Sequence, residues 1–93
     1  MKNVEYKNMI AGTAKNGADY IEAEVGALEI GDTVTRTIAP SARASQRRAR
    51  SAPKTIIETY VVTGFGGEFY SSILDCDVTR AYCEKTVKYV EVV

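Results

Sequence analysis

The strongest hydrophobic pattern in the chain lies in residues 55–63, where nearly every side chain is β-branched or aromatic. Such residues fit the pleated surface of a sheet, so the segment predicts a β-strand. Alternation places Ile57 and Val61 on one face of this strand, and Tyr60 and Val62 on the other. Because both faces carry apolar groups, we expect the strand to lie in the middle of its sheet.

A glycine-rich stretch, residues 64–67, follows this strand. Glycine accepts positive φ without steric cost, as a tight hairpin turn requires. Residues 68–74 then alternate again and read as a returning strand, so residues 55–74 predict a hairpin. A glycine loop that cradles phosphate would lead into a helix, and here a second strand is expected instead.

The N-terminal residues 4–25 fit two periods. Asn16 and Gly17 are a strong hairpin signal, and the residues after them alternate strictly between apolar and acidic, which predicts a hairpin with residues 4–13 as its first strand. Apolar residues in the same stretch also recur at helical spacing. Glycines recur in the segment at intervals too short for a long helix. We therefore favour the hairpin, with the helix as the alternative.

Two more strands are predicted outside the central hairpin. Gly31 and Asp32 form a turn pair, and the Thr, Val and Ile run that continues to residue 38 indicates a strand. Residues 75–85 suggest a short irregular turn, and residues 86–93 form a last strand whose apolar end we expect to dock in the sheet.

These elements predict a mainly β fold, or an α+β fold with one short helix. The 93 residues allow one domain with a modest core, and 45% hydrophobic and 26% charged residues are ordinary for a globular protein. No window approaches the roughly 18–20 apolar residues of a membrane span, and the N-terminus lacks the apolar region of a signal peptide. We therefore expect a cytoplasmic protein that does not enter a membrane.

The chain contains no histidine, which excludes the common catalytic triads and histidine-based zinc sites. An enzyme would have to rely on groups such as Glu68, Asp75 and Asp77 with nearby tyrosines. Asp75 and Asp77 alone offer fewer oxygens than a Mg²⁺ site normally gathers. The sequence thus argues against an enzyme, and it predicts neither a metal nor another cofactor.

Cys76 and Cys83 are the two cysteines. Their spacing matches neither a zinc knuckle nor a redox motif. We expect two reduced and partly buried thiols, with a disulfide as the alternative.

A basic segment spans residues 36–54, and no acidic residue lies between Asp32 and Glu58. The segment holds half of the twelve Lys and Arg residues, so it carries a net charge of +6 on a body of net charge −6. The formal net charge of zero conceals this dipole. The basic residues, which are the candidate partner-binding residues, are Arg36, Arg43, Arg47, Arg48, Arg50 and Lys54.

Residues 39–54 within it lie between two predicted strands. Pro40 and Pro53 bracket a run rich in Ala, Arg and Gln that favours a helix, and Ser41 could cap it. The run has no apolar side chain larger than alanine to anchor it, and an isolated helix of this length is marginal in water. We expect a projecting basic loop, or a helix that forms on a partner.

The order of elements in residues 28–93 resembles that of the small SH3-like β-barrels. In these barrels a strand with a Gly-Asp turn, here Ile30 to Val34, leads into a long variable loop and then a twisted hairpin. The aromatic peptide-binding signature of true SH3 domains is missing, since the chain has no tryptophan. The resemblance implies a binding module and transfers no binding residue.

Two functions fit these features. The first is an occlusion module that binds and blocks a larger protein or nucleoprotein complex, such as an inhibitor of the anti-CRISPR kind encoded by a phage or another mobile element. The second is a nucleic-acid-binding protein that holds RNA or DNA through its arginines, with Tyr60, Phe65 or Tyr70 stacking on bases if exposed. The apolar C-terminal edge strand also allows a homodimer.

Overall fold

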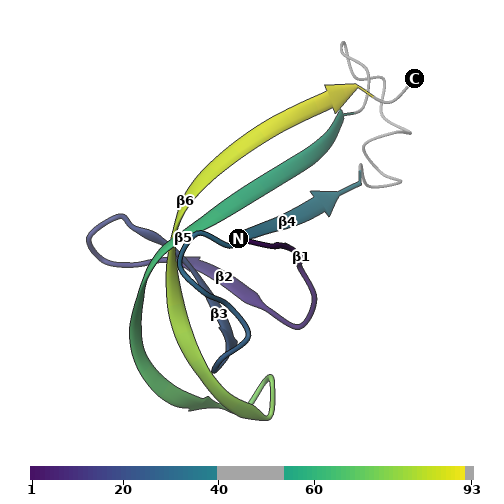
Figure 1. Ribbon diagram of the computed structural model, residues 1–93. Coiled ribbons are helices and arrows are strands. Elements are labelled where there is room, and N and C mark those ends of the chain that lie inside the picture. The colour runs from purple at the N-terminus through teal and green to yellow at the C-terminus, as the bar shows by residue number, and fades with distance from the viewer. Residues whose placement is uncertain (40–53, 92–93) are drawn as a thin grey trace.

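The computed structural model describes residues 1–39 and 54–91, which form six β-strands in one mixed sheet (Figure 1). The sheet order is β1-β4-β5-β6-β3-β2, and no helix occurs among the described residues. The strands are β1 (Asn3–Glu5), β2 (Ile10–Thr13), β3 (Asp19–Glu24), β4 (Thr33–Ile38), β5 (Lys54–Ser71) and β6 (Cys76–Glu91).

Two long antiparallel strands, β5 and β6, organise the sheet, and β5 lies in its middle as its pattern predicts. Their register shifts between Val62 and Gly64 and again between Phe65 and Glu68. Such bulges bend a strand pair and increase its twist, and Figure 1 shows the β5-β6 ribbon bending sharply midway. β4 pairs with β5 on one side of the bend, and β3 pairs with β6 on the other.

The bend curls the sheet around a single core. Val34 of β4 and Ile21 of β3 are both fully buried in this core, although their strands are not neighbours in the sheet. The Tyr6 and Tyr60 rings stack there, with 6.5 Å between their centroids. The described strands leave β1 and β2 as two separate edges, so the sheet is curled but open, and the SH3-like barrel is not confirmed.

The glycines of residues 64–67 are not a turn. They lie inside β5, and none of them has positive φ. The reversal falls at residues 72–75, where Asp75 has φ of 54° and the Leu74 amide donates to Ser71 Oγ. The prediction treated the glycines as a source of backbone freedom, whereas they lie where the sheet bends without positive φ. Of the three, only Gly66 has a close neighbour, the Tyr82 ring, where a Cβ would stand.

The C-terminal part of the prediction was also wrong in its boundaries. Residues 76–85 continue directly into the last strand, so the expected irregular turn belongs to β6. Apolar and polar residues alternate weakly there because β6 changes neighbours: it pairs with β3 up to Cys83 and only with β5 among the described residues afterwards.

At the N-terminus the hairpin is confirmed and the helix is wrong. β2 and β3 pair antiparallel around a turn in which Gly17 has φ of 88°. The single first strand expected over residues 4–13 is instead two strands. β1 pairs parallel with β4, with Val4 opposite Val34, and β2 lies at the other edge of the sheet.

The Gly31-Asp32 turn before β4 is confirmed. Gly31 has φ of 93°, and the buried Asp32 carboxylate accepts hydrogen bonds from the Glu29 amide (2.9 Å) and the Lys2 amide (3.2 Å). These bonds fix both the turn and the start of β1, so the residue has a structural role. The backbone bond from Glu29 is the main cause of a lowered Asp32 pKa.

Candidate binding surface

The half of the sheet beyond the bend, away from the β5-β6 turn, is a three-stranded arm that we call the distal arm. It consists of β4, residues 54–61 of β5 and residues 84–91 of β6. The arm lies next to the basic segment in the sequence, because the segment connects β4 to β5. It therefore carries both predicted site residues that the structure describes, Arg36 and Lys54.

The strand register places three rows of side chains on the concave face of the distal arm. Directly opposed residues of neighbouring strands share a face, and alternate residues of one strand do so as well. The rows, from the bend outward, are Val34-Tyr60-Lys85, Arg36-Glu58-Val87 and Ile38-Ile56-Tyr89. Val34 and Tyr60 of the first row belong to the core. We call the second row, which contains the Arg36-Glu58 ion pair, the ionic row, and the third the apolar row.

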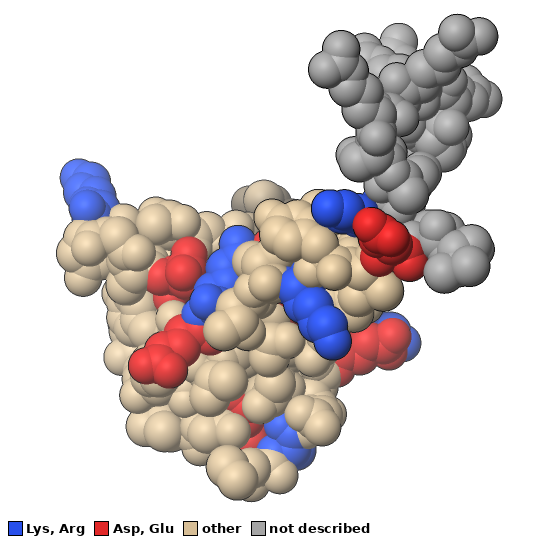
Figure 2. Space-filling model, turned by 90° about the horizontal axis from the view of Figure 1, so that it is seen from above, with Lys and Arg blue, Asp and Glu red and all other residues tan. Residues whose placement is uncertain are grey.

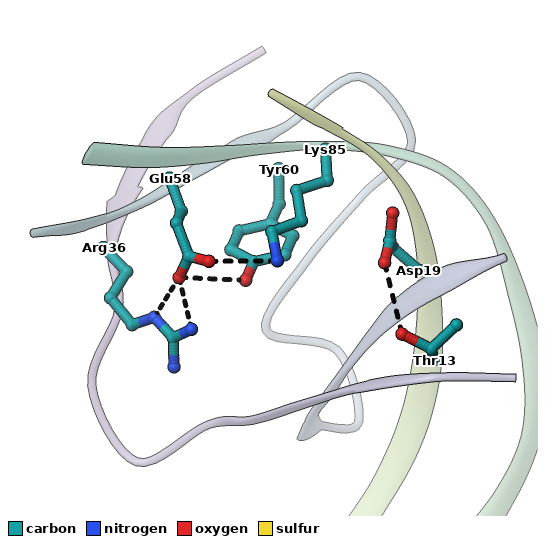
Figure 3. A network of polar contacts seen from close by, with 6 residues as sticks. All are labelled: Thr13, Asp19, Arg36, Glu58, Tyr60 and Lys85. Carbon is teal, nitrogen blue, oxygen red and sulfur yellow. Dashed lines mark hydrogen bonds and ion pairs between the residues drawn. The ribbon is translucent and has the colours of Figure 1, made fainter. Parts of the chain in front are cut away.

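Glu58 is the centre of the ionic row (Figure 3). One of its oxygens accepts hydrogen bonds from the Arg36 guanidinium and, at 3.3 Å, from the Tyr60 hydroxyl. The other oxygen lies 3.0 Å from the Lys85 ammonium. The Glu58 side chain is 8% exposed, so two cations from neighbouring strands share one nearly buried carboxylate.

The contacts around Glu58 go with shifted pKa values of Glu58, Lys85 and Tyr60. Burial disfavours the Glu58 carboxylate, but the hydrogen bonds from Lys85 and Arg36 outweigh it, and the Glu58 pKa is lowered. The bond to Glu58 raises the Lys85 pKa, and burial is the main cause of a raised Tyr60 pKa. All three shifts favour one charged state, with Glu58 ionised and Lys85 protonated.

A small polar cavity of about 210 Å³ lies beside this row. Thr13 Oγ1 donates to Asp19 Oδ1 at 3.4 Å on its far side, as Figure 3 shows. Both cations that line the cavity are already bonded to Glu58. The cavity is lined by Ala11, Gly12, Thr13, Asp19, Arg36, Tyr60 and Lys85.

The apolar row extends the concave face beyond the ionic one. Tyr89 is 62% exposed, Val87 42% and Ile38 38%, while Ile56 between them is half-buried. We call these four residues the distal patch. Large apolar side chains that lie together at the surface are typical of sites of contact with another molecule.

The predicted site residues are placed as follows. Arg36 lies in the ionic row with its guanidinium bonded to Glu58 and 4.9 Å from the centroid of the Tyr6 ring. Lys54 is exposed at the start of β5, opposite Glu91 and on the same face as Ile56. Arg43, Arg47, Arg48 and Arg50 lie outside the described residues, as does almost all of the basic loop predicted for residues 39–54.

Charges on the described surface are mixed. Figure 2 shows Lys and Arg side chains interspersed with Asp and Glu, with no separation into a basic and an acidic side on the face in view. The acidic excess calculated for the body of the chain is therefore not one continuous acidic surface on that face.

A second cluster lies on the opposite, convex face of the sheet, on the other side of the bend. The Arg80 guanidinium lies 4.6 Å from the centroid of the Tyr20 ring and 5.9 Å from that of Phe69. Tyr82 meets Tyr20 edge-on, with 6.4 Å between ring centroids. Sequence reasoning missed this cluster because its members come from three strands whose order in the sheet was unknown.

The aromatic side chains proposed for base stacking differ in exposure. Tyr60 is buried, whereas Phe65 and Tyr70 are exposed. The Tyr70 hydroxyl donates to Asp75, a residue considered for catalysis. Across residues 1–39 and 54–91, no three acidic or cysteine side chains are grouped closely enough to hold a metal ion.

No protein-family model, characterised protein or solved structure matches this chain. Among residues 1–39 and 54–91 there is no helix that could cross a membrane.

Proposed function

We propose that this chain is a non-enzymatic binding module that attaches to a larger protein or nucleoprotein complex through its distal arm and blocks it. The observation that carries the proposal is the distal patch, an exposed apolar row on a rigid sheet. It is flanked by the Arg36-Glu58 ion pair on one side and by Lys54 on the other. An apolar centre with a charged rim is the usual composition of a protein-binding surface.

The rigidity of the arm supports this role. Arg36 and Lys85 tie β4 and β6 to Glu58 on β5, so the three strands beneath the patch are connected by side chains as well as by backbone bonds. A surface that is already ordered loses little conformational entropy on binding. Tyr89, the most exposed member, is of a residue type that often dominates binding energy.

The basic segment begins and ends on this arm, so its arginines enter the same proposal. Arg43, Arg47, Arg48 and Arg50 would add contacts to an acidic or RNA-bearing partner beside the patch. Inhibition by occlusion in the cytoplasm, as by anti-CRISPR proteins of phages and mobile elements, is the activity that such a module would serve.

A pull-down from bacterial lysate tests the proposal, with and without nuclease. The test variant is Tyr89→Thr, and the matched control is Val90→Thr on the opposite face of the same strand; both keep a good strand-forming residue. We expect a protein complex that survives nuclease, is lost with Tyr89→Thr and is kept with Val90→Thr.

A different result would favour the second function. If capture is abolished both by nuclease and by replacing Arg47, Arg48 and Arg50 with alanine, while Tyr89→Thr has no effect, the chain is a nucleic-acid-binding protein. Its binding would then fall steeply with salt, because each phosphate contact releases counterions.

A further inference from the structure

Residues 84–91 of β6 form a strand edge that none of the described residues pairs with. β3 covers the edge of β6 as far as Cys83, which lies opposite Asp19, and it ends there. From Glu84 onward β6 is bonded to β5 on one side only. Its side chains are exposed on both faces, and its outward N–H and C=O groups are available to another strand.

We propose that this edge joins a second copy of the chain, with two β6 strands pairing antiparallel about a two-fold axis at Val87. The two distal arms would then form one continuous sheet. This interface is isologous, since each residue meets the same surface of the other copy. The interface shares Val87 and Tyr89 with the distal patch, but it is made through the edge of β6 and concerns the purified chain alone.

The order of charges along the edge selects this register. With Val87 opposite Val87, seven residues of each strand are paired, Lys85 lies opposite Tyr89 and Glu84 lies opposite Val90. Glu84 is also diagonal to Lys88 of the second copy, within reach of a long side chain. No like charges lie directly opposite each other.

The neighbouring registers are less favourable, because they either oppose like charges or shorten the pairing. Shifting the two strands by one residue brings Lys85 opposite Lys88 in one direction, and Glu84 opposite Glu91 in the other. Centring the pair on Lys88 places two lysines together at the axis. Centring it on Thr86 shortens the pairing to five residues, since β3 already occupies the edge at Cys83.

The apolar side chains and the net charge also favour a second copy as the occupant. Val87 and Tyr89 share the concave face, so the register places two Val87 side chains in contact and lays each Tyr89 ring against the stem of a Lys85. The formal net charge of the chain is zero, so no long-range repulsion opposes association of two copies.

Cysteine crosslinking of purified protein tests the register. In a Cys76→Ser background, Val87→Cys places two thiols at directly opposed positions, where Cα atoms about 4.5–5.5 Å apart permit a disulfide. In Thr86→Cys or Lys88→Cys, the thiols of the two copies lie at diagonal positions of the paired strands. They are then about 7–8 Å apart, which is beyond disulfide reach. Cys83 is buried and does not interfere.

We expect the unmodified chain to have twice its 10.2 kDa mass in sedimentation equilibrium, and Val87→Cys to crosslink roughly tenfold faster than either control. Val87→Lys, which sets two charges at the axis, should give a monomer, whereas Ile73→Lys in the β5-β6 turn should not change the mass. A monomer at every concentration tested would overturn the proposal. So would a Val87→Lys dimer, or crosslinking of Thr86→Cys or Lys88→Cys at the rate of Val87→Cys.

Discussion

Arg36 and Glu58 lie directly opposite each other on β4 and β5 and form an ion pair on the concave face of the sheet. Lys85 reaches the same carboxylate from β6, so one acidic residue joins three strands. The composition of the sequence assigned Arg36 to a basic segment with no acid near it. The register instead supplies its counter-charge from 22 residues further along the chain.

Removing the Glu58 charge should destabilise the fold. Glu58→Gln leaves two cations facing one neutral amide in a site that is nearly closed to water, and we expect a loss of about 2 kcal/mol in the free energy of unfolding. Urea denaturation at neutral pH measures it. Glu84→Gln, on the exposed part of β6, is the matched control and should change stability by less than about 0.5 kcal/mol. Equal effects of both variants would contradict a special role for Glu58.

The same residue should make stability depend on acid. The Glu58 pKa is lowered in the folded chain, because bonds from Lys85 and Arg36 outweigh the cost of burial. Stability from this shift is present above the unfolded pKa, near 4.5, and is lost as the pH falls through the folded pKa. Urea midpoints measured between neutral pH and about pH 3 should therefore fall less steeply for Glu58→Gln than for the unmodified chain. Parallel slopes would show that Glu58 does not contribute.

Gly12 should tolerate no side chain, because Tyr20 lies across it from the neighbouring strand. A Cβ at residue 12 would lie 2.7 Å from the Tyr20 hydroxyl oxygen and 2.8 Å from Cζ of the same ring. Gly12→Ala must therefore displace a ring that also contacts Arg80, at a cost of about 1–2 kcal/mol.

Gly64→Ala is the control for this substitution. Nothing lies within 4 Å of a Cβ at residue 64, and its φ is not positive. It should be neutral or stabilising by up to about 0.5–1 kcal/mol, because alanine reduces the entropy of the unfolded chain. Thermal unfolding of the two variants compares them directly, and a larger loss for Gly64→Ala would refute this account of the glycines.

Local patterns predicted the strands well but not their arrangement. The runs around Ile57 and Val34 are strand-forming whatever they pair with, and Asn16-Gly17 forms the turn that its residue types favour. The pairing of β1 with β4 depends on contacts between distant residues, so no local pattern indicates it. The glycines before Glu68 misled the prediction because glycine also occurs inside a strand without positive φ, and only the structure distinguishes that case from a turn.

The candidate site could be predicted only in part, because it too depends on how distant strands are arranged. The sequence predicted a last strand over residues 86–93, but the exposure of Val87 and Tyr89 follows from β3 ending opposite Cys83. The distal patch exists because one strand of the sheet is longer than its neighbour. Sequence periodicity cannot reveal that difference, since it reports the faces of a strand and not the length of the strand beside it.

Asp32 should be required for the turn before β4. Asp32 is 1% exposed, and its carboxylate accepts hydrogen bonds from two backbone amides, which Asp32→Ala leaves without an acceptor. We expect a lower melting temperature and faster amide exchange at Glu29 and Lys2. Asp77→Asn, at an exposed position on β6, should leave both measurements unchanged. Unaltered exchange at Glu29 in Asp32→Ala would contradict this role.

The two cysteines should behave as separate thiols with different reactivity. Cys76 and Cys83 are seven positions apart on one extended strand, about 23 Å, which is too far for a disulfide. Burial raises the pKa of Cys83 to about 11, so little reactive thiolate forms near neutral pH, while Cys76 is half-buried. A thiol reagent added to the native chain should label Cys76 first, and urea should then make Cys83 reactive. Cys76→Ser should abolish the early phase. Fewer than two reactive thiols after unfolding without a reductant would show that the cysteines are bonded, and equal rates in the native chain would show that Cys83 is not protected by the core.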